Sequence, residues 1–386
     1  AVDMLVMSGD TQTSLVDELI ALPRAATDAE LQAWHDSTRP LGDQYVPLGT
    51  FWSLDWDSPD DTLEVQVRAR DRMELLRKST YQPGAVVQST SLYALAEHVL
   101  QDAGLEPHEY LIDTGLQSII IPWAWLPPTD HREALRIIAE AGLAVAYADR
   151  DGVVRVESLT GGSGETVLDI TKDDYYPPLN APSRQDQVAN EIVVTTRPLR
   201  PATTAEEVYR SNTAIAIPAG QTVTVTARYD QPPVIEAVAS LDSSPADVSI
   251  TGTTYQAWGA EVSIRNTGAS SADVTLVITG KPLTVRGGEQ VIRRDEQSIV
   301  ENGVLRYEFP ASPLVQTLGQ AQAIAETILA SAKDPRRDIE VEWRGNPALE
   351  LGDRVSVVGQ DVSVIRQQID WAGALSARLI GRKVTR

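Results

Sequence analysis

The chain has 386 residues, 42% of them hydrophobic, which is typical of a folded protein with two to four domains. Asp and Glu (54) outnumber Lys and Arg (33), and the net charge of −21 argues against binding nucleic acid or anionic lipid through a basic surface. Cysteine is absent, which excludes disulfides and thiolate metal sites. We find no apolar run of the roughly 18 residues that cross a bilayer, and no signal-peptide pattern, so we expect a soluble protein.

The first stretch of the chain has the pattern of a sheet with a helical insertion. Val2–Met7 has strand character. Helical spacing of apolar residues after Thr13, and a capping box that begins at Thr27, predict two inserted helices. The sheet then resumes in two alternating segments, Tyr45–Trp56 and Leu63–Ala69.

The next stretch mixes helices and strands. Two amphipathic segments, Thr90–Leu100 and Thr129–Ala141, predict helices. Strand patterns on both sides of Asp149–Gly152 predict a β-hairpin with an Asp-Gly turn. We therefore predict a small α+β domain over residues 77–170.

A change of composition marks the following part of the chain. A flexible junction at Thr160–Gly164 and a Pro-containing loop at Tyr175–Arg184 lead into it. Between residues 215 and 285, short alternating runs are separated by Gly, Pro, Asn and Asp, which is typical of a β-sandwich. We predict a connecting segment over residues 171–200 and an inserted sandwich over residues 201–290.

The last part of the chain is strand-rich around one turn. Residues 339–343 alternate apolar and acidic side chains, which predicts a strand with one buried face. Gly345–Pro347 must leave the sheet, and we expect Leu349 and Leu351 to turn inward as a plug. The barrel that we predict over residues 291–386 also contains strands at 295–299, 303–307, 355–358, 362–365 and 377–384, and a helix at Leu318–Ala330.

Several of these stretches resemble one family. They are "NPALELGDRVSV" after "AQAIAETILASA", "VPLGTFWSLDW" with "LEVQVRARDRMELL", and "EALRIIAEAGLAVAYADRDGVVRVES". The chain resembles phage tail hub proteins, the family of the contractile-phage baseplate hub and the siphophage tail-associated protein. The resemblance implies an α+β multidomain fold, mainly β. It has two hub-type β-barrels, a small α+β domain and an inserted β-sandwich, and the first barrel, with its helical insertion, occupies residues 1–76.

The resemblance also implies a function. It indicates a structural virion protein, not an enzyme: a homotrimeric hub at the tail tip that closes the tail tube and attaches fibres or a lytic module. Two barrels from each of three chains would form a pseudo-sixfold ring. The implied partners are the other copies, the distal tail or tube protein ring, the tape-measure protein and fibre or lytic tip proteins. No cofactor, sequence-specific nucleic-acid contact or membrane segment is implied, and the chain would be assembled in the host cytoplasm.

Candidate metal ligands do not form a recognisable motif. No H-E-x-x-H or H-x-H pattern occurs, and we expect His98 and His131 at the solvent edges of their helices. The pattern Asp149-x-Asp151-Gly152 begins like a calcium loop, but the closing Glu of such a loop is missing and a hairpin turn explains it. We therefore predict no metal site among the four histidines, His35, His98, His108 and His131.

Two other patterns leave alternatives open. The acidic turn formed by Asp55, Asp57, Asp60 and Asp61 is compatible with a calcium site or with the paired carboxylates of a glycosidase, although solvated surface acids are commoner. Trp123 and Trp125 are compatible with stacking on sugar rings, or with packing in the domain or an interface. Gly161–Gly164 lacks the Lys of a phosphate loop and is typical of a linker.

Two rival functions follow from these patterns. A cell-wall or polysaccharide hydrolase would lose its activity, with the fold intact, in Asp57→Asn or Asp60→Asn. A sugar-binding adhesin would act through the sandwich, and residues 200–290 alone would then bind glycans.

Overall fold

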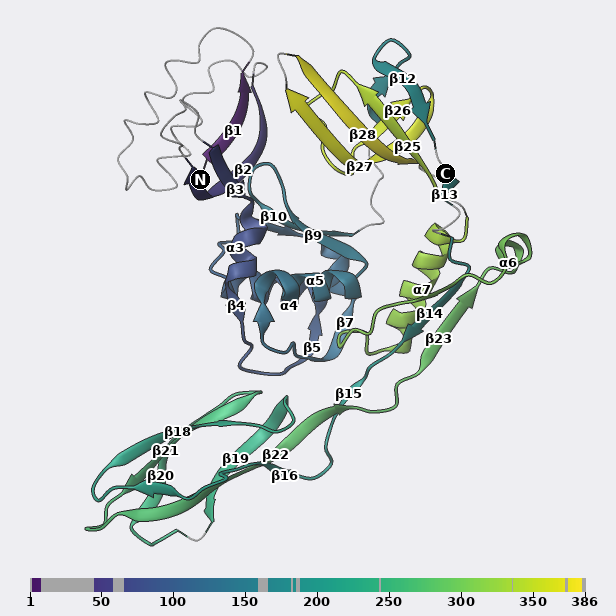
Figure 1. Ribbon diagram of the computed structural model, residues 1–386. Helices are drawn as coiled ribbons and strands as arrows, with labels where there is room; N and C mark the ends of the chain where they lie inside the picture. Colours follow the sequence, from purple (N-terminus) through teal and green to yellow (C-terminus); the bar gives the residue numbers. More distant parts are fainter. Residues whose placement is uncertain are drawn as a thin grey trace.

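The structure is a computed structural model in which several separate bodies are joined by extended segments (Figure 1). It describes residues 2–7, 45–57, 66–158, 166–181, 183–184, 188–242, 244–334, 336–371 and 374–383. The predictions that lie outside these ranges are the two inserted helices after Thr13 and from Thr27, the junction at Thr160–Gly164, His35, Asp60 and Asp61.

The predicted strands of the first barrel form one antiparallel sheet. Its order is β1-β2-β3, from β1 (Val2–Met7), β2 (Tyr45–Asp57) and β3 (Gln66–Arg70). Helix α3 (Arg72–Lys78) follows directly and turns Met73 and Leu76 into the core of the next body. These three strands and the first residues of α3 are the described part of the barrel predicted over residues 1–76.

The α+β unit forms as the periodicity predicts. Helices α4 (Leu92–Asp102) and α5 (His131–Ala141) begin at Ser91 and Asp130, whose side chains accept the Ala94 and Glu133 N–H groups. The apolar face of each helix is buried. The unit also contains β4 (Thr80–Tyr81), β5 (Val87–Ser91), β6 (Tyr110–Ile112), η1 (Thr114–Ser118), β7 (Ile120–Ala124), β8 (Thr129–Asp130), β9 (Ala144–Ala148) and β10 (Val154–Ser158).

A second layer packs on this unit, and here the predicted barrel over residues 291–386 is wrong in part. Helix α7 (Leu318–Ala332) covers a sheet of order β23-β14-β24, and the two share one core with the α+β unit (Figure 1). Residues 296–302, predicted to begin in a strand, form helix α6. Periodicity showed the apolar face of α7 but not what covers it. The other elements are β14 (Glu191–Thr195), β23 (Gln290–Arg294), α6 (Glu296–Asn302) and β24 (Arg306–Glu308).

The last barrel sheet curls around a core of its own. Its order is β11-β26-β27-β28-β25-β12, with β13 paired to β25. The predicted alternation is confirmed, because Ile339, Val341 and Trp343 are at most 5% exposed. The strands are β11 (Thr166–Ile170), β12 (Tyr175–Asn180), β13 (Ser183–Arg184), β25 (Arg336–Trp343), β26 (Arg354–Val357), β27 (Gln360–Trp371) and β28 (Leu375–Lys383).

Three predictions about this barrel need correction. The loop predicted at Tyr175–Arg184 contains the strands β12 and β13, and its prolines are tolerated because β12 lies at the edge of the sheet. Strand β11 pairs with β26, so the boundary predicted at residue 170 does not coincide with the sheet pairing. Leu349 is buried as expected, whereas Leu351 is 60% exposed.

The predicted sandwich is confirmed as a body with its own core (Figure 1). Strand β22 pairs with β15, β16, β17 and β19, and a second sheet of order β18-β21-β20 faces them. No helix in the described part of the chain is long and apolar enough to cross a membrane. The strands are β15 (Leu199–Pro201), β16 (Glu206–Arg210), β17 (Ile215–Ile217), β18 (Thr222–Arg228), β19 (Val234–Asp242), β20 (Val248–Tyr255), β21 (Gly259–Asn266) and β22 (Ala272–Val285).

Candidate functional site: the junction at the β9–β10 turn

Three bodies meet at the turn between β9 and β10. The Arg150 side chain, 16% exposed, reaches the last barrel, where Nε lies 2.6 Å from Glu350 Oε1. Its Nη2 donates to the carbonyls of Ala348 (3.2 Å) and Leu349 (3.1 Å). The backbone carbonyl of Arg150 accepts from Thr50 Oγ1 in the first sheet at 3.2 Å. One residue therefore contacts both predicted barrels.

The turn that carries Arg150 is held rigid by Asp149. This carboxylate is 5% exposed, and its Oδ1 accepts the N–H groups of Asp151 (3.1 Å) and Val153 (2.8 Å). Its Oδ2 accepts from Arg155 Nε at 2.6 Å. Gly152 has a φ of 78°, and a Cβ there would lie 3.1 Å from Thr50 Cβ. Both Asp149 oxygens are engaged within the hairpin, which agrees with the turn interpretation and not with a calcium loop.

The receiving turn of the last barrel is also held by its own contacts. Asn346 Oδ1 accepts the Ala348 N–H at 2.9 Å, and Asp353 Oδ2 accepts the Glu350 N–H at 2.8 Å. Leu349 is 6% exposed and plugs the barrel core. Two preformed turns thus face each other, with Arg150 between them.

A second contact ties the first sheet to the α+β unit. The Arg72 guanidinium lies 5.3 Å from the centre of the Trp52 ring, within the range of a cation–π interaction. The same guanidinium donates to Glu109 Oε1 at 2.7 Å. Desolvation acts to raise the pKa of Glu109, but the Glu106 N–H and Arg72 together hold it below its ordinary value.

The histidine prediction is wrong for His131, which is 2% exposed. Its Nδ1 lies 2.8 Å from Ser79 Oγ, and its Nε2 lies 3.0 Å from Asp102 Oδ2. These residue types also form hydrolytic triads. Here, however, Ser79 Oγ lies 3.2 Å from the carbonyls of Leu75 and Leu76, which it can cap at the end of α3.

The buried histidine therefore joins three helix ends. Ser79 at the end of α3 and Asp102 at the end of α4 both contact the ring of His131, the first residue of α5. Burial raises the pKa of the neighbouring Tyr81 to about 12, with Asp102 adding to the effect. His98, which is exposed, lies 3.2 Å from the Tyr81 hydroxyl, and His108 is exposed. The described residues contain no group of three or more His, Asp or Glu side chains that could hold a metal ion.

The other candidate residues are dispersed. Asp55 is 59% exposed, and its carboxylate lies 3.7 Å from Arg68, so the contact is that of a surface pair on an open strand. Asp57 ends strand β2. Trp125 is 8% exposed, which agrees with packing, and Trp123 is half-buried.

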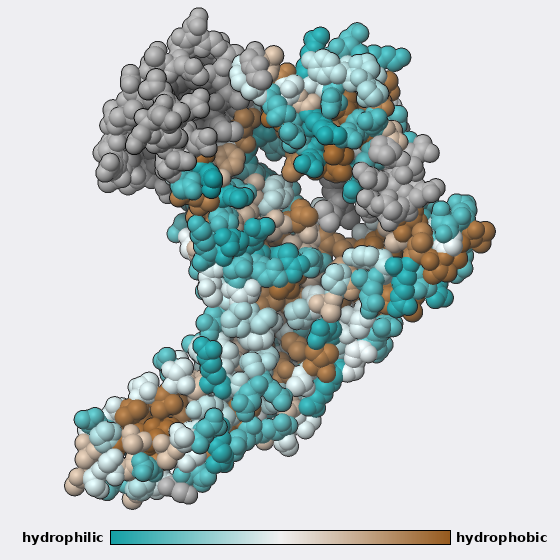
Figure 2. All heavy atoms as spheres, viewed as in Figure 1, coloured by the Kyte–Doolittle hydropathy of each residue, from teal (hydrophilic) through white to brown (hydrophobic). Residues whose placement is uncertain are grey.

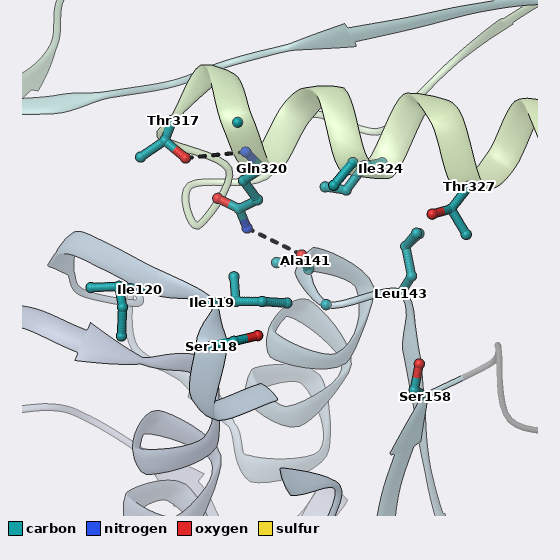
Figure 3. A pocket seen from close by; sticks show the side chains of 13 residues that line it. Ser118, Ile119, Ile120, Ala141, Leu143, Ser158, Thr317, Gln320, Ile324 and Thr327 are labelled. Carbon is teal, nitrogen blue, oxygen red and sulfur yellow. Dashed lines mark hydrogen bonds between the residues drawn. The ribbon is translucent and has the colours of Figure 1, made fainter. Parts of the chain in front are cut away.

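A cavity of about 540 Å³ lies between the α+β unit and α7 (Figure 3). Ile119, Leu143 and Ile324 line it with apolar surface. Gln320 crosses one end, where its Nε2 donates to the Ala141 carbonyl at 3.1 Å. No charged side chain lines the cavity, and its polar side chains are the hydroxyls of Ser118, Ser158, Thr317 and Thr327 and the amide of Gln320.

Sequence reasoning found the β9–β10 turn but not its role. An arginine in an Asp-Gly turn is ordinary, and no spacing connects Arg150 with Glu350. The one available signal was that the "NPALELGD" turn and this hairpin both lie in stretches that resemble the same family.

Solved structures similar to this chain are tail proteins. The 43 kDa tail protein of prophage MuSo2 from Shewanella oneidensis has 10% identity over 88% of this chain and 80% of that chain, with a TM-score of 0.47. The tail protein from Neisseria meningitidis MC58 has 10% identity over 88% and 82%, with a TM-score of 0.49. The prophage tail protein gp18 from Listeria monocytogenes EGD-e has 11% identity over 87% and 77%, with a TM-score of 0.45.

No protein-family model and no curated protein sequence matches the chain.

Proposed function

We propose that the chain is a structural protein of a phage-type tail, and that it works by assembly. The observation that carries this proposal is the junction at Arg150, where a rigid hairpin connects the first sheet with the last barrel. Such a junction fixes two sheets relative to each other, which a ring component needs.

In the finer form of the proposal, the chain is the homotrimeric hub at the tail tip. Each chain would supply the first sheet and the last barrel to a ring of six similar units, which closes the tail tube and carries fibres or a lytic module. Its partners would be the distal tail or tube protein ring and the tape-measure protein. The sequence resemblance of both barrel stretches supports this form.

Light scattering over a concentration series tests the oligomer. A trimer would have about three times the chain mass of 41.9 kDa. A monomer at every concentration, both alone and with a purified tube protein, would contradict the hub. Glycan hydrolysis by the full chain would instead favour the hydrolase, and glycan binding without hydrolysis would favour the adhesin.

A further inference from the structure

We propose that Arg150 acts as a clamp. Its side chain sets the orientation of the last barrel relative to the α+β unit, and it can release the barrel while both the barrel and the unit stay folded. The device is the pairing of one side chain with the 348–350 turn. It goes beyond the proposed function because it concerns how a single chain changes shape.

The two turns do not depend on the clamp for their own structure. Asp149 holds the hairpin through three contacts, and none of them uses Arg150. The 346–353 turn is closed by its own Asn346 and Asp353 and by buried Leu349. Removal of the arginine side chain therefore leaves two intact turns that no longer touch through it.

The last barrel and the α+β unit have separate cores. The buried cluster of the last barrel contains only residues of that barrel, such as Ile170, Val341 and Leu379. The α+β unit and α7 share a different cluster. Where two bodies share no core, a small number of polar contacts contributes much to fixing their relative orientation.

Arg150 holds the two barrels by different atoms. The first sheet is bound to its backbone carbonyl and the last barrel to its guanidinium. A change of the side chain should therefore free one barrel and leave the other in place. Glu350 is 51% exposed, so salt or a binding partner can reach the ion pair.

Under the proposed hub function, release of the last barrel would change the width of the ring. That consequence rests on the proposed function. The clamp is a property of one chain and is tested by distances within it, whereas the hub is tested by the oligomeric state, so the two proposals can fail separately.

The experiment measures distances between spin labels in the full chain. Because the chain has no cysteine, Gln88→Cys with Ser376→Cys labels the α+β unit and the last barrel, and Ser53→Cys with Gln88→Cys labels the first sheet and the α+β unit. All three positions are exposed. We expect Arg150→Ala to broaden the first distance distribution at least twofold and to leave the second unchanged. Glu350→Gln should broaden the first by less.

The matched control is Arg378→Ala, which removes an ion pair with Glu340 inside the barrel sheet. It should leave both distributions narrow. The clamp is refuted if Arg150→Ala leaves the first distribution as narrow as in the native chain, or if Arg378→Ala broadens it equally. Circular dichroism of each variant checks the fold, and Glu350→Gln, at a half-exposed side chain, provides the test if Arg150→Ala does not fold.

Discussion

Asn190 shows at the scale of one residue how a buried amide positions a projecting helix. The side chain is fully buried, with Nδ2 donating to the Gly303 carbonyl at 2.7 Å and Oδ1 accepting the Leu305 N–H at 2.8 Å. These bonds hold the end of α6 against β14. Val300 of α6 and Val304, which follows the helix, are 86% and 62% exposed. Hydrophobic residues gather at this corner of the surface (Figure 2).

Asn190→Ala should lower the free energy of unfolding by about 1 to 3 kcal/mol, because it leaves buried backbone groups without partners. Urea unfolding measures the change. The control is Asn302→Ala, whose half-buried amide donates to the Ser298 carbonyl within α6. An equal loss in both variants would contradict the role of Asn190.

Asp295 makes the stability of α6 depend on pH. The Ser298 N–H and then Lys333 hold the pKa of this carboxyl below its ordinary value. A lowered pKa stabilises the folded state above the unfolded pKa of about 4, and this contribution is lost as the pH falls through the folded pKa.

Asp295→Asn should therefore reduce the acid sensitivity of the chain. The urea midpoint of the native chain should exceed that of the variant at pH 7, and the difference should shrink as the pH falls below about 4. Parallel curves over this range would rule out a contribution from Asp295.

At the scale of elements, Gln316 joins β7 to the start of α7. The Gln316 side chain is 5% exposed and bonds to both backbone groups of Trp123. Its Oε1 accepts the Trp123 N–H at 3.2 Å, and its Nε2 donates to the Trp123 carbonyl at 2.6 Å. A further bond reaches the Pro313 carbonyl at 2.8 Å. The α7 layer is thereby anchored to the α+β unit at this end.

Gln316→Ala should cost about 2 to 3 kcal/mol, since it leaves both Trp123 backbone groups unpaired. Chemical denaturation followed by tryptophan fluorescence measures this loss. Gln297→Ala removes one bond to Glu301 on the exposed face of α6 and should change stability by at most about 0.5 kcal/mol. A similarly small loss in Gln316→Ala would refute the anchor.

The sequence predicts elements better than it predicts their partners. Alternation at Ile339–Trp343 and helical spacing at Leu92–Leu100 identify buried faces, because periodicity depends only on local geometry. The surface that covers α7 and the pairing of β11 with β26 both depend on contacts between residues that are distant in the sequence. Arg150 was missed for the same reason: its chemistry is ordinary, and its partner lies 200 residues away in the chain.

On the scale of the whole molecule, the sandwich is an independent body. Its buried cluster has no member from another body. The two segments that connect it run side by side, since Leu199 pairs with Val285 and Pro201 with Leu283. One bond, from the Ala257 N–H to the Gly84 carbonyl at 2.7 Å, links it to the α+β unit.

Replacing residues 202–282 with a short Gly linker should therefore leave the rest of the chain folded. Calorimetry of the shortened chain should lose one unfolding transition and keep the others, because separate cores unfold separately. Loss of the remaining secondary structure by circular dichroism would contradict this independence. A Gly linker replacing residues 318–332, which carry part of the shared core, should by contrast disrupt the fold.

The pairing of β11 with β26 has a consequence for synthesis on the ribosome. Thr166 in β11 can pair only after Arg354 in β26 has been made, about 190 residues later. At about 5 to 20 residues per second, the early strand remains without its partner for roughly 10 to 40 s. The nascent chain thus carries an incomplete sheet while the sandwich and α7 are made, and its last barrel closes only after β28 has been made.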